Sequence, residues 1–215
     1  MDRGATRRDG ATRRDGATRR DGATRRDLVV GGLAAAGAAV GLGAEPALGD
    51  KAPPSDTELL GNSLGVERLM VLAYRRVLDS GLLPADFQRV IAPHLGHEVS
   101  HVKALAARLA SMGAPAPTGP LDPKTASATM AQYHVSDSLT DLHSQNDCLK
   151  LLVDLESVAE GIHYTALKDL RSPALQVLSV QIMACEAQHW TVLSGLRNPG
   201  EYVKSVPWPY VYGSK

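Results

Sequence analysis

Two short motifs of the form Glu-x-x-His stand out in this chain of 215 residues as pairs of metal-ligating side chains. One is Glu98-Val-Ser-His101 and the other is Glu186-Ala-Gln-His189. Residues three positions apart project from the same face of an α-helix, so each motif can direct a carboxylate and an imidazole at one point. This donor mixture suits iron and manganese better than the metals that prefer thiolate.

Each motif follows a single glutamate that lies within an apolar helical stripe. Glu67 precedes Glu98 by 31 positions, and Glu156 precedes Glu186 by 30 positions. Around all of these residues, apolar side chains recur every three or four positions, which predicts that the glutamates and histidines face a common core. Four buried carboxylates would carry a severe desolvation penalty without cations beside them. The sequence therefore predicts a site for two divalent cations.

The apolar stripes predict two antiparallel helical hairpins. The expected helices run from Ser55 or Asp56 to Ser80, from Pro84 to Met112, over about 140–170, and from Pro173 to Asn198. Short links favour antiparallel pairing within each hairpin. The proline-rich residues 113–124 are expected to exclude helix, with at most one short helix before residue 140. Such a long connection fits a crossover between parallel second and third helices.

With one glutamate from each of two helices and Glu-x-x-His from the other two, residues 56–197 resemble the ferritin-like superfamily, which includes ferritins, rubrerythrins and manganese catalases. The resemblance implies an all-α, ferritin-like four-helix bundle with a long crossover. It also implies bridging roles for Glu98 and Glu186, and two iron ions as cofactors, with two manganese ions as the alternative. The implied ligands are Glu67, Glu98, His101, Glu156, Glu186 and His189.

Two further residues extend the internal symmetry. Tyr74 lies seven positions after Glu67, where the family often has a tyrosine beside the ligands, and His163 lies seven positions after Glu156. Such side chains could orient the ligands through hydrogen bonds. An ordinary core aromatic is the alternative interpretation of Tyr74.

Other polar residues close to the motifs have simpler interpretations. His94 and His97 are interpreted as ordinary helix-face histidines. Glu160 lies one turn after Glu156, and an extra or alternative ligand is the minor interpretation of it. Cys148 should lie about 12 Å along the helix axis from the level of Cys185. No disulfide between them is expected, because bonded cysteines need Cα atoms within about 7 Å.

Residues 1–49 are predicted to be an export region, disordered or cleaved. Four copies of Gly-Ala-Thr-Arg-Arg-Asp offer no apolar face to bury. Arg25 and Arg26 then precede the weakly apolar residues 28–44, a layout that resembles a twin-arginine export signal. This predicts an extracytoplasmic or cell-envelope protein that engages the export machinery. An uncleaved membrane anchor is the alternative, although five glycines among these 17 residues make a marginal span.

The remaining chain is expected to form the bundle, residues 50–197, and an extended tail, residues 198–215. Residues 50–215 hold 14 Lys and Arg against 17 Asp and Glu, with no basic face, so nucleic acid is not an expected partner. The expected partners are metal ions and a small oxidant. The favoured function is that of an oxidoreductase. It would oxidise iron as a ferroxidase, or react with dioxygen or peroxide as a peroxidase or catalase. The alternatives are an iron-storing homo-oligomer and a metal-free interaction module of the envelope.

Overall fold

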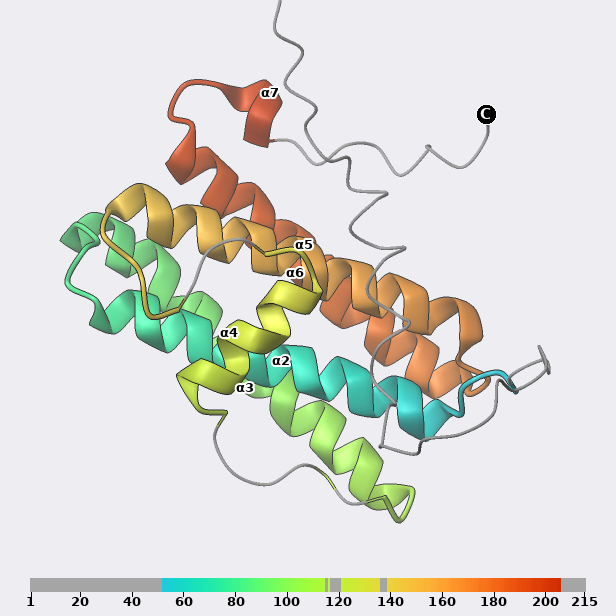
Figure 1. Cartoon of the computed structure of the whole chain (residues 1–215). Coiled ribbons are helices and arrows are strands. Elements are labelled where there is room, and N and C mark those ends of the chain that lie inside the picture. The colour runs from blue at the N-terminus through green and yellow to red at the C-terminus, as the bar shows by residue number, and fades with distance from the viewer. Residues whose placement is uncertain (1–51, 115, 117–120, 136–138, 206–215) are drawn as a thin grey trace, which may run out of the picture.

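The computed structural model describes residues 52–114, 116, 121–135 and 139–205, and within these residues the chain is all-α, with no strand. This confirms the expected fold class. Figure 1 shows the long helices packed lengthwise, with a short helix lying across them. The helices are α2 (Asp56–Asp79), α3 (Ala85–Ser111), α4 (Pro123–Gln132), α5 (Gln145–Asp169), α6 (Pro173–Arg197) and α7 (Tyr202–Ser205).

The bundle is assembled from two hairpins. Helix α2 packs against α3 and α5, and α5 packs against α6, whereas α3 and α6 meet through far fewer residue pairs. Tyr74 contacts Glu156, and Glu67, two turns earlier in α2, contacts His163 two turns later in α5. Helices α2 and α5 therefore run antiparallel. Since α3 also returns alongside α2, helices α3 and α5 are parallel, as a crossover connection requires.

Side-chain caps mark the starts of α2, α4 and α5. The hydroxyl of Ser55 accepts a hydrogen bond from the Glu58 amide, and the Glu58 carboxylate accepts one from the Ser55 amide, forming a capping box. The helix expected from about residue 140 begins at Gln145 instead, because the Ser144 hydroxyl accepts a hydrogen bond from the Asp147 amide. The other three long helices begin and end within about one residue of the predicted positions.

The proline-rich connection is not entirely free of helix. Helix α4 begins at Pro123, inside the segment 113–124 that was expected to exclude helix. Proline is tolerated at the first position of a helix, because its missing N–H would have no partner there. The Asp122 carboxylate accepts a hydrogen bond from the Thr125 amide and caps the helix. Ala126 then joins the apolar core of the bundle.

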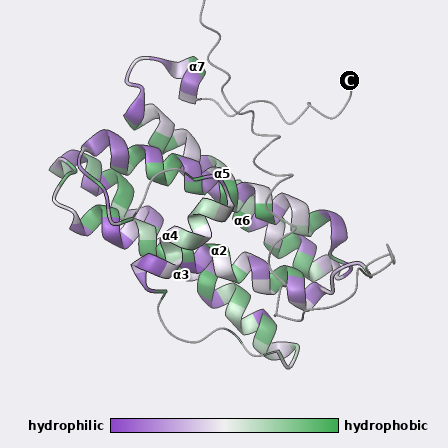
Figure 2. Ribbon diagram, in the orientation of Figure 1, coloured by the Kyte–Doolittle hydropathy of each residue, from purple (hydrophilic) through white to green (hydrophobic). Residues whose placement is uncertain are grey.

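Two apolar clusters lie on either side of the glutamates. Each long helix carries both polar and apolar residues, as Figure 2 shows by the purple and green along its length. Burying one leucine or methionine side chain contributes about 1.5–3 kcal/mol to folding. One cluster includes Leu60, Leu64, Leu105 and Leu109, and the other includes Met70, Val77, Leu149 and Leu152. Glu67 lies between Leu64 and Met70 in α2, so the polar level separates the two clusters.

Helix α7 is a short turn that packs against the end of α6, in a region where an extended tail was expected. The residues from Val206 to Tyr212, the export region 1–49 and the pair Arg25 and Arg26 lie outside the described residues. Among the helices that are described, none combines the length and the apolar composition needed to cross a lipid bilayer.

Candidate metal centre

The six predicted ligands meet at one level of the bundle. They project from four different helices, with Glu67 on α2, Glu98 and His101 on α3, Glu156 on α5, and Glu186 and His189 on α6. All four glutamates have an exposed fraction of 0%, and His189 is 2% exposed. The structure therefore brings together every ligand that the motifs predicted. Their binding of metal remains a prediction.

Their ligand atoms form two overlapping groups, and within each group all atoms lie within 4.8 Å of one another. The first group is Glu67, Glu98, His101 and Glu186, and the second is Glu98, Glu156, Glu186 and His189. Glu98 and Glu186 belong to both groups, which is the arrangement that two bridging carboxylates would adopt. Glu67 with His101, and Glu156 with His189, would then be the terminal ligands of separate ions.

Several buried oxygens of this cluster accept no hydrogen bond. They are both carboxylate oxygens of Glu98, Oε2 of Glu156 and Oε1 of Glu186. Imidazole nitrogens come within 2.9 Å of two of them, from His189 to Glu98 and from His101 to Glu186, but without hydrogen-bond alignment. Buried oxygens without partners are rare and costly. Converging donor atoms of this kind are suited to divalent cations, so the residues fit a dinuclear metal centre.

In the absence of cations, protons offset part of the negative charge. Burial raises the pKa of Glu98 to about 7, even with His101 and His189 beside it. Burial, joined by the negative charge of Glu186, also raises the pKa of Glu156 well above its usual value. Both carboxyls therefore hold protons more strongly than they would in water. Cations entering the site would have to displace these protons.

The other two carboxyls are held in the ionised form by the histidines. Burial would raise the pKa of Glu186, but His101 and His189 outweigh burial and lower it. The pKa of Glu67 is also lowered, because hydrogen bonds from His101 and His163 outweigh its burial. Burial opposes the charged form of His101, yet the surrounding carboxylates and Cys185 raise its pKa. The metal-free cluster is thus an array of ion pairs and shared protons.

Tyr74 and His163 make a reciprocal pair of contacts across the bundle. The hydroxyl of Tyr74 donates a hydrogen bond to Oε1 of Glu156, and Nε2 of His163 lies 2.7 Å from Oε1 of Glu67. Each side chain follows the lone glutamate of its own helix by two turns and contacts the lone glutamate of the other helix. Burial, together with the charge of Glu156, raises the pKa of Tyr74 well above its usual value, so the phenol remains a donor.

Sequence reasoning missed a histidine cluster beside the centre. His94 is buried, and its ring stacks on that of His189 with 4.2 Å between centroids, so it is not an ordinary helix-face residue. Nδ1 of His97 lies 2.9 Å from Nε2 of His189. The position of His94 one turn before Glu98, on the same apolar stripe, was the available signal. The contacts across to α6 had no signal in the sequence.

Two remaining expectations concern residues near the centre. Glu160, for which a ligand role was the minor interpretation, is buried, but it joins neither ligand group among the described residues. Cys148 and Cys185 are both free thiols, which confirms that they form no disulfide. Burial raises the pKa of the Cys148 thiol.

Comparison with known proteins agrees with this architecture. A crystal structure of a conserved hypothetical protein from Mycobacterium tuberculosis is similar, with a TM-score of 0.55 and 18% identity over 66% of this chain and 96% of that one. At this identity the likeness shows the fold alone. No protein with a curated description matches the chain. The family model of the ferritin-like domain, however, matches residues 55–199, well over half of the chain. The chain therefore belongs to the ferritin-like domain family.

Proposed function

We propose that the chain binds two iron or manganese ions at its six convergent ligands and reacts there with dioxygen or peroxide. One observation carries this proposal. Glu98 and Glu186 belong to both groups of ligand atoms, and three of their four carboxylate oxygens are buried without a hydrogen bond. A polar cluster that served only stability would be expected to satisfy these oxygens.

The donor set narrows the class of metal. The two groups supply only carboxylate oxygens and imidazole nitrogens, which suit iron and manganese. When bound, such ions would supply electrons to an oxidant by changing oxidation state. The helices hold the ligands at a fixed spacing. The two apolar clusters limit the access of water to the site from either end of the bundle. The Tyr74 hydroxyl holds a proton beside Glu156, one of the terminal ligands.

Metal content and oxidant turnover test the proposal directly. Protein purified without a histidine tag should bind two ions of Fe²⁺ or Mn²⁺ per chain under anaerobic conditions, with a rise in the melting temperature. Oxygen or peroxide should then be consumed. The double variant Glu98→Gln with Glu186→Gln should lose both binding and turnover, whereas Glu201→Gln, at an exposed ion pair with Lys204, should lose neither.

Other outcomes would select a different function. Binding of two ions in a large assembly, with retained ferric product, would replace oxidant removal by iron storage. Wild-type protein that binds neither Fe²⁺ nor Mn²⁺ and gains no thermal stability from them would leave only the metal-free interaction module. In that case the double variant should be as stable as the wild type or more so, because it removes buried charge.

Export by the twin-arginine route is a separate proposal that rests on Arg25, Arg26 and the apolar residues after them. It supports an extracytoplasmic protein that is folded before export. Changing both arginines to lysine should retain the protein in the cytoplasm of a host with this pathway. Export of the doubly substituted protein at the wild-type level would rule the route out.

A further inference from the structure

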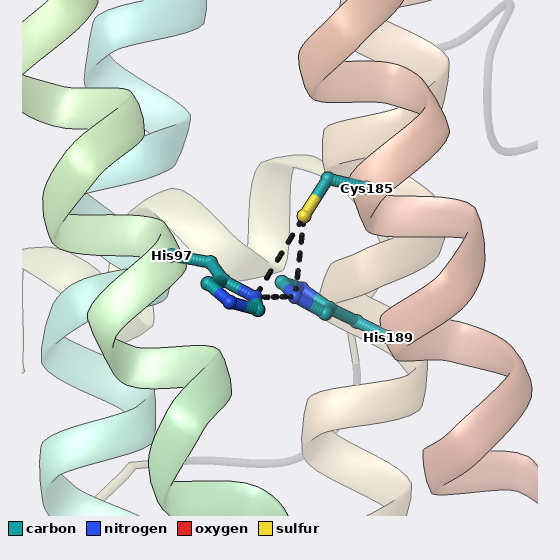
Figure 3. A group of neighbouring side chains, drawn as sticks. All are labelled: His97, Cys185 and His189. Carbon is teal, nitrogen blue, oxygen red and sulfur yellow. Dashed lines mark hydrogen bonds between the residues drawn. The ribbon is translucent and has the colours of Figure 1, made fainter.

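A cysteine and two histidines gather beside the dinuclear centre, on its solvent side. Cys185 and His189 project from α6 and His97 from α3, and Figure 3 shows the cysteine sulfur directed toward both imidazole rings. His97 is exposed, Cys185 is half-buried and His189 is buried. The group therefore extends from the interior to the surface. It lies between α3 and α6, which pack together less extensively than the other neighbouring long helices.

The separations within this group match those of a tetrahedral metal site. Nδ1 of His97 and Nε2 of His189 are 2.9 Å apart, and Sγ of Cys185 lies 3.4 Å from the His189 nitrogen and 3.8 Å from the His97 nitrogen. A tetrahedral zinc ion with its usual bond lengths would set nitrogens about 3.3 Å apart, and sulfur and nitrogen about 3.6 Å apart. Shifts of a few tenths of an ångström would thus suffice to accommodate the ion.

We propose that His97, Cys185 and His189 form a third, mononuclear site for a zinc-type cation. A thiolate with two imidazoles is a softer donor set than the carboxylate-rich dinuclear centre, and it suits zinc better than manganese. The Cys185 thiol gives up its proton when the ion binds. Three protein ligands leave one coordination position for a water molecule, which the exposure of His97 makes accessible.

The site shares one imidazole with the dinuclear centre. Nδ1 of His189 lies 2.9 Å from Glu98 and 3.2 Å from Glu186, whereas Nε2 faces His97 and Cys185. Ions at both nitrogens would require the ring to lose both protons and would place positive charges on its two sides. A zinc-type ion should therefore weaken iron or manganese binding, and the effect must be reciprocal. This linkage rests on the proposed function, but the mononuclear site does not.

Cobalt is a suitable probe, because a thiolate ligand gives Co²⁺ a near-ultraviolet charge-transfer band. Full-length protein without a histidine tag, kept reduced by a phosphine, should develop this band and the visible bands of tetrahedral Co²⁺, and Zn²⁺ should displace them. Cys185→Ser should abolish the near-ultraviolet band. His97→Gln should weaken Co²⁺ binding about tenfold or more.

Matched variants separate this site from other parts of the protein. Cys148→Ser and His143→Gln, at the other cysteine and at an exposed histidine paired with Asp141, should leave the band unchanged. Glu67→Gln alters the dinuclear centre without touching the cluster and should also retain the band. Wild-type protein that shows the band but binds no Fe²⁺ would thus count against the proposed function only.

A second measurement does not depend on any variant folding. Zn²⁺ should slow alkylation of Cys185 in the wild-type protein, as read by peptide mass spectrometry. Absence of the thiolate band in the wild type, its persistence in Cys185→Ser, or alkylation of Cys185 at the same rate with and without Zn²⁺ would each overturn the proposal. In those cases the three side chains form a hydrogen-bonded cluster and nothing more.

Discussion

Tyr74 in α2 donates a hydrogen bond to Glu156 in α5, so a candidate ligand of one hairpin is oriented by a side chain of the other. His163 does the same in return for Glu67. Both contacts are buried, and each joins residues at least 82 positions apart in the chain. Each half of the bundle therefore positions the lone glutamate, Glu67 or Glu156, of the other half.

Removing this phenol should weaken the centre without dismantling it. Tyr74→Phe leaves an oxygen of buried Glu156 without its donor, so we expect a loss of about 1–3 kcal/mol in the unfolding free energy. Metal affinity should fall about 10-fold to 100-fold, because the carboxylate loses its orientation. Denaturant titration and calorimetric metal titration measure the two effects. Tyr164→Phe, at a half-exposed tyrosine beside Lys168, is the control and should change neither quantity.

The two kinds of glutamate should differ in metal stoichiometry. Glu98→Gln removes a ligand that belongs to both groups, so it should impair binding of both ions. Glu67→Gln removes a ligand of one group, so the second ion should remain. Plasma mass spectrometry after gel filtration gives the number of ions per chain. Glu160→Gln is the control at a buried glutamate of the same bundle, and a loss of metal in that variant would make Glu160 a ligand after all.

The metal-free protein should lose stability as the pH rises from about 4.5 to about 7. Burial raises the pKa of Glu98 from its usual 4.5 to about 7 in the folded chain, so the folded state binds more protons across this window. The unfolding free energy must then fall with rising pH, and the raised pKa of Glu156 acts in the same direction. The lowered pKa values of Glu67 and Glu186 stabilise the fold, and this contribution is lost only as the pH falls below about 4.5.

Bound metal should reverse this trend, because cations bind the deprotonated ligands. The rise in melting temperature that Mn²⁺ produces should therefore grow between pH 5.5 and pH 7.5, about 2–4 °C for each kcal/mol. Thermal melts with Mn²⁺ and with a chelator supply the comparison. A chelated protein equally stable across the window, or a Glu98→Gln variant with the full wild-type pH dependence, would contradict the assignment of the proton to Glu98.

Asp56 should matter more to stability than its surface position suggests. Its carboxylate accepts hydrogen bonds from the Arg171 amide at 2.9 Å and the Ser172 amide at 3.1 Å, joining the start of α2 to the turn between α5 and α6. Asp56→Ala should cost about 1–2 kcal/mol of unfolding free energy, measured by urea titration. Asp154→Ala, which breaks a half-exposed pair with Lys150, should cost well under 1 kcal/mol. Equal losses would mean that Asp56 acts only as a surface charge.

The bundle and its six candidate ligands could be predicted because both depend on periodicity along single helices. Glu67 and Glu156 interrupt apolar stripes. Ser55 caps its helix by contacting Glu58, only three positions along the chain. The start of α5 was harder to predict, because the apolar periodicity also extends upstream of Ser144, the residue that caps the helix.

The cluster of His94, His97 and Cys185 could not be predicted in this way. Its contacts depend on how far α3 and α6 are rotated about their own axes, and no spacing within either helix reports that rotation. His94 shares a stripe with Glu98, which indicates burial but not its stacking on His189. The sharing of His189 between two sets of neighbours likewise appears only once the helices are placed side by side.

Each of the two ligand groups takes three residues from one hairpin and a single glutamate from the other. Bound ions would consequently act as two non-covalent staples between the halves of the chain. The two fragments of a protein cut once in the connection between α3 and α4 should then associate more tightly with metal than without it. The crossover would then matter less for keeping the halves joined than for bringing them together during folding.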